Sequence, residues 1–133
     1  MAVTATPIFS QAVRHAVATI STANTNRDGS GTIGTIFTAD ATDGSIVDHV
    51  DITAIGTTTA GVVRLYVHNG SASFLWKEIL VTAITPSTSV AAFSATVDCS
   101  LRSGVLFLPA GWSLRASTHN AESFNVHAFG SDL

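Results

Sequence analysis

Histidine is the residue type of this chain best suited to acid–base catalysis or metal binding, and the chain has five histidines. Four of them take polar positions in segments where apolar and polar residues alternate: His49, His68, His119 and His127. In the strand pairing favoured below, His127 faces Arg115, a cation that cannot be a metal ligand. No histidines have the spacing of a zinc or catalytic motif, so we interpret them as scattered surface or interface side chains.

The segment Asp48-His49-Val50-Asp51 places an imidazole and a carboxylate on one strand face, because alternate residues of a strand share a face. This pair could orient the imidazole or begin a metal site. No nucleophile or third ligand is defined nearby, and the chain has no G-x-S-x-G motif, so a solvated strand edge is the preferred interpretation. A small hydrolase or cupin-like metal enzyme rests on the histidines alone. We therefore expect no enzyme, no catalytic residue, no cofactor and no metal.

Residues 24–30 read Asn-Thr-Asn-Arg-Asp-Gly-Ser and superficially resemble the start of a calcium loop. Only Asp28 supplies a carboxylate, and Thr35 stands where a bidentate glutamate would close the loop. The negative charge is too small for Ca²⁺. Because Asn, Asp and Gly favour turn conformations, the segment predicts a hairpin connection.

The chain is rich in Ser, Thr, Val and Ile, with turn-forming residues at short intervals, and this pattern predicts an all-β fold. We expect a two-sheet antiparallel β-sandwich of jelly-roll type. An extended N-terminal arm would cover residues 1–13 and a single domain residues 14–133. The expected strands are residues 14–22, 31–39, 45–55, 61–68, 73–81, 89–98, 104–108, 111–119 and 123–129.

The clearest hairpin joins residues 61–68 to residues 73–81 through Asn69-Gly70, the strongest short signal for a two-residue turn. This turn would place Leu65 opposite Phe74, and Val63 opposite Trp76, on the apolar side. The other face would then carry Arg64, Tyr66, Leu75, Lys77 and Ile79. That outer face has more apolar area than contact with water alone would favour.

A second hairpin is predicted from the alternating residues 111–119 and 123–129. The three-residue loop Asn120-Ala121-Glu122 would pair Ala116 with Val126, whereas a two-residue loop would bring polar positions opposite apolar ones.

Charge is sparse: the 133 residues include six Lys or Arg and nine Asp or Glu, for a formal net charge of −3. With 46% hydrophobic residues and no basic run, the composition argues against a nucleic-acid partner and favours partner subunits as cover. Arg14 and His15 interrupt the apolar N-terminal residues, and no stretch is apolar enough to span a membrane, so we expect no membrane association and no conventional secretion. Cys99, the single cysteine, can make no internal disulfide.

Four segments carry a resemblance to a family. Residues 106–117 read Leu-Phe-Leu-Pro-Ala-Gly-Trp-Ser-Leu-Arg-Ala-Ser and form a sharp β-corner, and residues 22–29, 56–65 and 120–126 accompany them. In general pattern, the chain resembles small tailed-bacteriophage virion structural proteins. The resemblance implies a β-sandwich that decorates or cements a capsid, or builds fibres and tail parts, and it brings no catalytic residues.

From this resemblance we expect a capsid decoration or cement protein that forms a homo-oligomer, in particular a homotrimer, and bridges the major capsid protein. Its location would be the capsid surface of a virion assembled in the host cytoplasm. The residues expected to contact sister subunits or the capsid are Phe9, Arg64, Tyr66, Leu75, Ile79 and Arg115. The alternative is a fibre or tail module that binds a receptor or carbohydrate, with Trp112, Tyr66 or Trp76 as a stacking platform.

Overall fold

The computed structural model describes residues 12–99 and 106–133, and these form nine β-strands. The strands are β1 (Ala12–Ile20), β2 (Gly34–Thr38), β3 (Ser45–Ala54), β4 (Gly61–His68), β5 (Ser73–Val81), β6 (Ser94–Asp98), β7 (Leu106–Leu108), β8 (Ser113–Thr118) and β9 (Phe124–Asp132). Each predicted strand is present, and the largest difference is at residues 89–98, where the strand begins only at Ser94. Residues 12 and 13, expected in the arm, belong to β1. The rest of the predicted arm lies outside the described residues.

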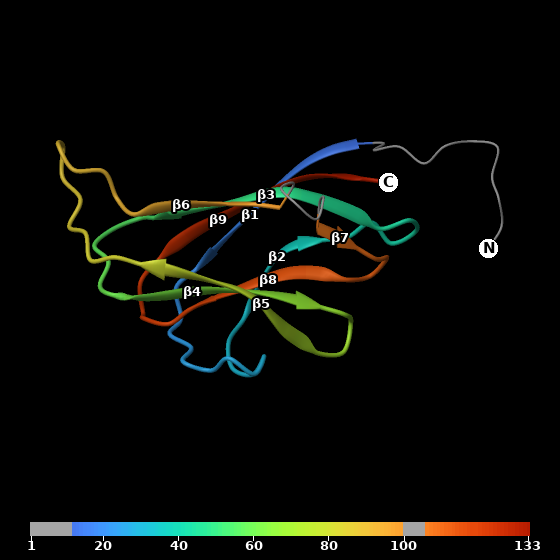
Figure 1. Cartoon of the computed structure of the whole chain (residues 1–133), viewed down its shortest axis with the longest axis horizontal. Coiled ribbons are helices and arrows are strands. Elements are labelled where there is room, and N and C mark those ends of the chain that lie inside the picture. Colours follow the sequence, from blue (N-terminus) through green and yellow to red (C-terminus); the bar gives the residue numbers. More distant parts are fainter. Residues whose placement is uncertain (1–11, 100–105) are drawn as a thin grey trace.

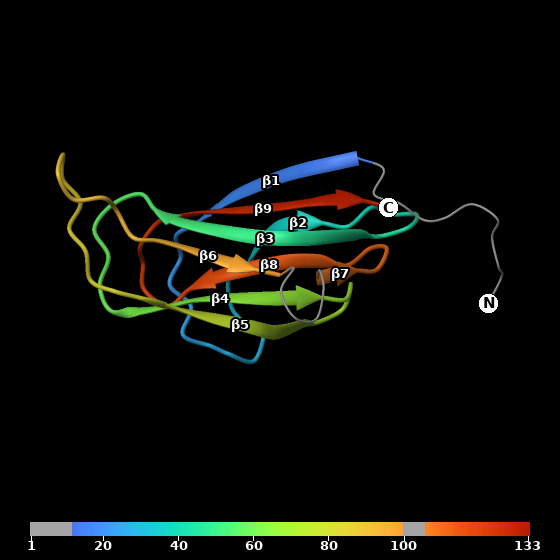
Figure 2. The same cartoon turned by 45° about the horizontal axis from the view of Figure 1, so that its top comes forward.

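The strands form two antiparallel sheets that pack face to face, as Figures 1 and 2 show. One sheet has the order β1-β9-β3-β6, with the short β7 also paired to β3, and the other has the order β2-β8-β4-β5. The predicted two-sheet antiparallel sandwich is confirmed. Strands that are consecutive in sequence often lie in different sheets, so most neighbours within a sheet are distant along the chain.

The hydrophobic core lies between the sheets, where alternate side chains of the strands point inward. Fully buried aliphatic and aromatic side chains come from both layers, such as Val50 and Val126 from one sheet and Phe37, Leu65 and Leu114 from the other. Because every second residue of a strand points inward, the residues between them point to the outer face of the sheet. These outer faces carry the candidate functional residues.

The predicted second hairpin is wrong. β8 pairs with β2 and β4, whereas β9 pairs with β1 and β3 in the other sheet. Ala116 consequently lies opposite Leu65 and not opposite Val126. Both strands do alternate as expected. Alternation, however, shows only which side chains point inward, and the inward side chains of two strands can meet either across the sandwich or as neighbours in one sheet.

The first hairpin is confirmed, but its predicted register is wrong. Its loop spans residues 69–72, and the side-chain oxygen of Asn69 accepts the backbone N–H groups of Ser71 and Ala72. This turn places Val67, and not Leu65, opposite Phe74. The predicted two-residue turn was too short because the Asn69 side chain stabilises a longer one.

A β-bulge then changes the faces of β5. Tyr66 pairs with Leu75 and Leu65 pairs with Lys77, so Trp76 is the extra residue of the bulge. Beyond the bulge Ile79 lies opposite Val63, whose side chain is in the core. A one-residue insertion moves every following side chain to the other face, and the prediction that Ile79 belongs to the outer face is therefore wrong.

Candidate interaction surfaces

Residues 21–33, the cover segment, connect β1 to β2 and lie against the outer face of the four-stranded sheet, below β4 and β5 in Figure 1. The backbone N–H of Asn24 donates to the carbonyl oxygen of Thr118 at 2.8 Å. At Gly29, a Cβ atom would lie 2.2 Å from the backbone oxygen of Ser73, so only glycine allows this approach. The cover segment thus reaches from β8 to the β4–β5 hairpin.

The cover segment is built from turns, as predicted, but it is not a hairpin connection because β1 and β2 belong to different sheets. The side-chain amide of Asn24 donates to the carbonyl oxygens of Ser30 and Thr32 at 2.9 and 3.0 Å. Asp28 accepts from the hydroxyl and the backbone N–H of Ser30, and these hydrogen bonds lower the pKa of its carboxyl. The oxygen-bearing side chains that resembled a calcium loop are thus used to shape the segment.

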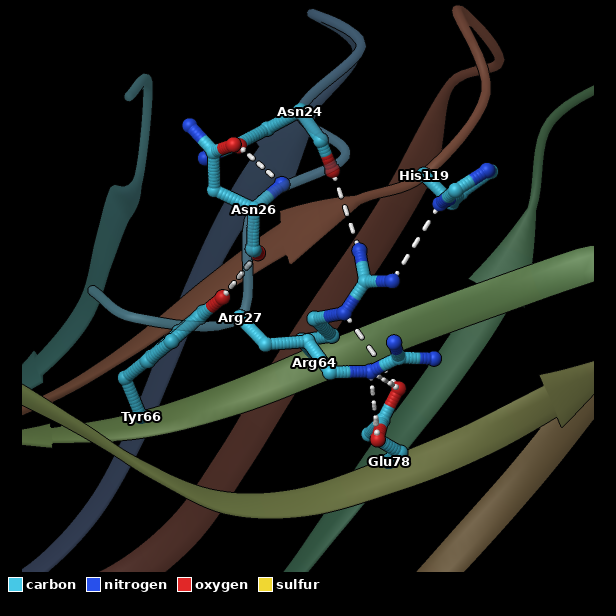
Figure 3. Close-up of polar contacts among 7 residues, drawn as sticks. All are labelled: Asn24, Asn26, Arg27, Arg64, Tyr66, Glu78 and His119. Atoms are coloured by element: carbon cyan, nitrogen blue, oxygen red, sulfur yellow. Dashed lines mark hydrogen bonds and ion pairs between the residues drawn. The ribbon is translucent and has the colours of Figure 1, made fainter. Parts of the chain in front are cut away.

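Arg64 was expected on an outer contact face, but the structure buries it beneath the cover segment with 1% of its surface exposed. Figure 3 shows its guanidinium among three partners. Nη1 donates to the carbonyl oxygen of Asn24 at 3.0 Å, and Nη2 lies 3.2 Å from Nδ1 of His119. Nε lies 3.3 Å from Oε2 of Glu78 as an ion pair, without the alignment of a hydrogen bond. This arginine secures the cover segment and is not exposed to a partner.

Tyr66 is also buried, and the prediction that it is exposed on the outer face is wrong. Its hydroxyl donates to the carbonyl oxygen of Asn26 at 2.9 Å (Figure 3). Arg27, beside Asn26, donates from Nε to both carboxylate oxygens of Glu78 at 3.1 Å. The sequence predicted that Arg64 and Tyr66 would be exposed on the outer face of the four-stranded sheet. In the structure, the cover segment lies over both side chains.

The other predicted contact residues have different environments. Leu75 is exposed on the outer face beside Tyr66, as expected. Arg115 is half-buried, and its Nε donates to the hydroxyl of Ser113 at 3.1 Å. Ile79 is partly buried and packs against the core, and Phe9 lies outside the described residues. Of the six, only Leu75 is an exposed apolar side chain among the residues that the structure describes.

Strand β5 forms one edge of the four-stranded sheet and exposes three large apolar side chains. Leu80 is 72% exposed, Phe74 is 56% exposed and Leu75 is 37% exposed. Phe74 and Leu80 were not predicted as contact residues: the expected register placed Phe74 on the apolar side of the hairpin, and it assigned no face to Leu80. Exposed apolar side chains on an edge strand are suited to contact with another protein.

Strand β1 forms an edge of the other sheet and also exposes apolar side chains. Val13 is 92% exposed and Val17 is 53% exposed, while His15 lies between them on the same face. The sequence contained the signal for this face, because these residues alternate with Arg14, Ala16 and Ala18. This apolar face was not predicted, because residue 13 was assigned to the N-terminal arm.

The histidines are less scattered than predicted. The rings of His15, Phe129 and His49, from β1, β9 and β3, form a row of directly opposite residues on the outer face of the sheet. Phe129 stacks on His15 with 4.4 Å between ring centroids and on His49 with 4.5 Å, each pair within 15° of parallel. Both flat faces of the Phe129 ring are therefore covered by imidazoles.

His127 occupies the next row of the same face, opposite Val17 and Asp51, and does not face Arg115. Its Nδ1 lies 2.7 Å from Nε2 of His15. Asp51 accepts a hydrogen bond from the hydroxyl of Thr96 at 2.7 Å. The interpretation of separate histidines was wrong because their clustering depends on which strands are neighbours.

Within residues 12–99 and 106–133, no set of three or more His, Cys, Asp or Glu side chains is placed to hold a metal ion. Burial raises the pKa of the Cys99 thiol to about 11, which disfavours the reactive thiolate. Trp76 and Trp112 are partly buried against the core. The described part of the chain forms no helix long and apolar enough to cross a membrane.

Comparison with known proteins yields only distant similarity. No family model matches the chain, and no curated protein sequence matches it. A chain of the cyanophage Pam1 capsid asymmetric unit is 14% identical, with a TM-score of 0.46, over 99% of this chain and 94% of that chain.

Two matches are to the infectious bursal disease virus. The T13 IBDV viral particle is 16% identical with a TM-score of 0.36, over 99% of this chain and 35% of that chain. The Gt strain is 15% identical with a TM-score of 0.35, over 98% of this chain and 36% of that chain. In both cases this chain spans about one third of the viral chain that it matches. Similarity at this level assigns neither a family nor an activity.

Proposed function

We propose that this protein is a structural protein of a tailed-phage virion, in particular a decoration or cement protein on the outer surface of the capsid. In this proposal the chain forms a homo-oligomer, with a trimer as the expected form, and bridges subunits of the major capsid protein. It performs no chemical reaction.

The observation that carries the proposal is the position of the exposed apolar side chains. Five of the eight large apolar side chains that are exposed in the described part of the chain lie on the two long outer strands: Val13 and Val17 on β1, and Phe74, Leu75 and Leu80 on β5. The chain has only fifteen charged side chains in 133 residues. In a monomer, the exposed apolar side chains of these two strands would be in contact with water. Contact with other subunits removes that apolar surface, at roughly 25 cal/mol for each Å².

The strand order supports the expected jelly-roll type. When the short β7 is set aside, eight strands divide into the sheets β1-β9-β3-β6 and β2-β8-β4-β5, with connections that repeatedly cross between the layers. Such double-sheet jelly rolls occur in viral capsid proteins and also in lectins and cupins. A fold alone does not define a function, so the choice among capsid proteins, lectins and cupins rests on the surface residues.

Bridging would work by mass action. A protein that binds only the assembled shell stabilises that shell, and many weak contacts combine through the valency of an oligomer. Leu75 and Leu80 of β5 would lie against sister subunits, and the N-terminal segment that contains Phe9 would bind the capsid. Arg64 and Tyr66 would contribute indirectly, because they hold the cover segment beside β5.

The test is a reconstruction of the native particle combined with one surface variant. We expect density for this chain on the shell, and Leu80→Lys should weaken its binding to shells without changing its unfolding temperature. Thr57→Lys, at an exposed polar position outside the strands, is the matched control and should bind normally. Density only at the tail would contradict the decoration role, and absence of the chain from particles would contradict the proposal as a whole.

A further inference from the structure

The edge strands of the sandwich, which are β1, β2, β5, and β6 and β7 beside β3, differ in how they are protected from pairing with another chain. β2 and β6 have only five residues each, and short edges are poor templates. β5 has nine residues, but it carries Lys77 and Glu78 and contains the bulge at Trp76. β1 also has nine residues, and it pairs with β9 over its whole length without any shift in register.

The one Lys or Arg residue of β1 does not protect its free edge. Arg14 points inward, where its Nη1 donates to the carbonyl oxygen of Thr38 at 2.7 Å and to Oδ1 of Asp132 at 2.9 Å. Its guanidinium carbon also lies 4.2 Å from the centre of the Phe37 ring. Among the described residues, β1 is thus a long, regular edge that has neither an outward Lys or Arg, nor a proline, nor a bulge.

The row of stacked rings ends at this edge. It runs from His49 on β3 through Phe129 on β9 to His15 on β1, and β1 is the outermost strand. Val13 and Val17 flank His15 on the same face and are its most exposed apolar neighbours. A strand added beside β1 would bring its own side chains against these three residues.

We propose that β1 pairs antiparallel with β1 of a second copy of this chain, with His15 directly opposite His15 of that copy. The inference deepens the proposed function and rests on its self-association. Pairing about His15 places Val13 opposite Val17 on both sides of the two-fold axis, so the exposed valines cover one another. The ring row continues across the axis, and Arg14 lies opposite the small Ala16, so the two Arg14 side chains do not lie opposite each other.

A second copy fits this edge better than an unrelated strand does, because the side-chain pattern of β1 is complementary to itself. A two-fold contact uses the same residues twice, and the order Val13, His15, Val17 is symmetric about its middle residue. Pairing about Ala16 would cover all nine residues, but it would set Val13 opposite the polar Thr19. Pairing about His15 is therefore the register that sets each exposed valine opposite another valine.

Disulfide trapping tests the register directly. In the proposed pairing, the Cβ atoms of His15→Cys in two copies lie about 4.5 to 5.5 Å apart, close enough for a cross-strand disulfide after slight adjustment. Val17→Cys would lie about 13 Å from its own copy, which prevents the bond. We expect mild oxidation of purified protein to convert His15→Cys into a linked dimer and to leave Val17→Cys and the native chain, whose Cys99 is buried, unlinked.

Preferential linking through Ala16→Cys or Val17→Cys would overturn the register. Absence of a linked dimer from all three cysteine variants would overturn the pairing itself. The His15→Cys readout is taken on non-reducing gels, so it detects this contact whether or not other contacts assemble a trimer.

Lysine substitutions test whether the linked dimer depends on the edge of β1. His15→Cys/Val17→Lys should lose the linked dimer, because a lysine on an edge strand opposes pairing, whereas His15→Cys/Leu80→Lys should retain it. Both lysines replace exposed apolar side chains, so circular dichroism should show equal folding. Equal loss in both would overturn the assignment to β1. A chain that pairs in solution but is absent from particles would contradict the proposed function alone.

Discussion

Arg64 and Asn24 are joined by a hydrogen bond that ties the cover segment to the centre of the four-stranded sheet. Nη1 of Arg64 donates to the backbone carbonyl oxygen of Asn24 at 3.0 Å, in a site where the arginine is almost fully buried. A buried cation is tolerated only when its donors have partners. The cover segment supplies one partner, and His119 and Glu78 supply the others.

Replacing Arg64 with methionine should destabilise the protein by about 3 kcal/mol, because the variant removes this group of contacts. Urea unfolding followed by tryptophan fluorescence measures the change. Arg115→Met is the matched control on the same sheet face. Because Arg115 makes one hydrogen bond with the described residues, to Ser113, this variant should cost about 1 kcal/mol or less. Equal losses in the two variants would contradict a special role for Arg64.

Tyr66→Phe should cost about 1 kcal/mol, because it removes one hydrogen bond and preserves the ring. The effect should be local to the cover segment, whose Asn26 accepts that bond. Hydrogen exchange should become faster at the amides of residues 24–26 and stay unchanged in β3 and β9. Uniformly faster exchange would show instead that the hydroxyl supports the whole fold.

Gly29→Ala and Gly70→Ala separate backbone strain from close contact. Both glycines have positive φ angles, 87° and 94°, and each substitution should cost roughly 1 kcal/mol for that reason alone. A Cβ at Gly29 would also collide with the backbone oxygen of Ser73, whereas Gly70 has open space around it. Thermal unfolding should therefore show a larger loss for Gly29→Ala, and equal losses would contradict the close packing of the cover segment.

Asp132 should make stability depend on acid pH. The hydroxyl of Ser45 and then the Arg14 guanidinium lower the pKa of its carboxyl. Because the folded-state pKa lies below the unfolded value of about 3.9, the stabilisation is complete above that value and disappears as the pH falls through the folded-state pKa. Asp132→Asn should be less stable than the native chain at pH 7, and the difference should shrink at pH 3.

Urea unfolding at the two pH values measures this change. Asp43→Asn is the control, because its carboxylate makes no hydrogen bond or ion pair with the described residues. A difference between Asp132→Asn and the native chain that is constant with pH would show that the carboxyl does not titrate differently in the folded state.

Local patterns in the sequence determined the strands and several turns. Alternation identified β4 and β8, and Asn69-Gly70 identified a hairpin, because these signals depend on residues within a few positions of one another. These features carry over into the structure because they need no knowledge of distant partners.

Only the tertiary structure decided which strands are neighbours and which faces remain open. The bulge at Trp76 moved Ile79 to the core side, and the cover segment buried Arg64 and Tyr66, although their own strand alternates as expected. His15, Phe129 and His49 form a row only because β1, β9 and β3 lie side by side. The physical reason is that alternation defines the two faces of a strand, whereas long-range packing decides what covers each face.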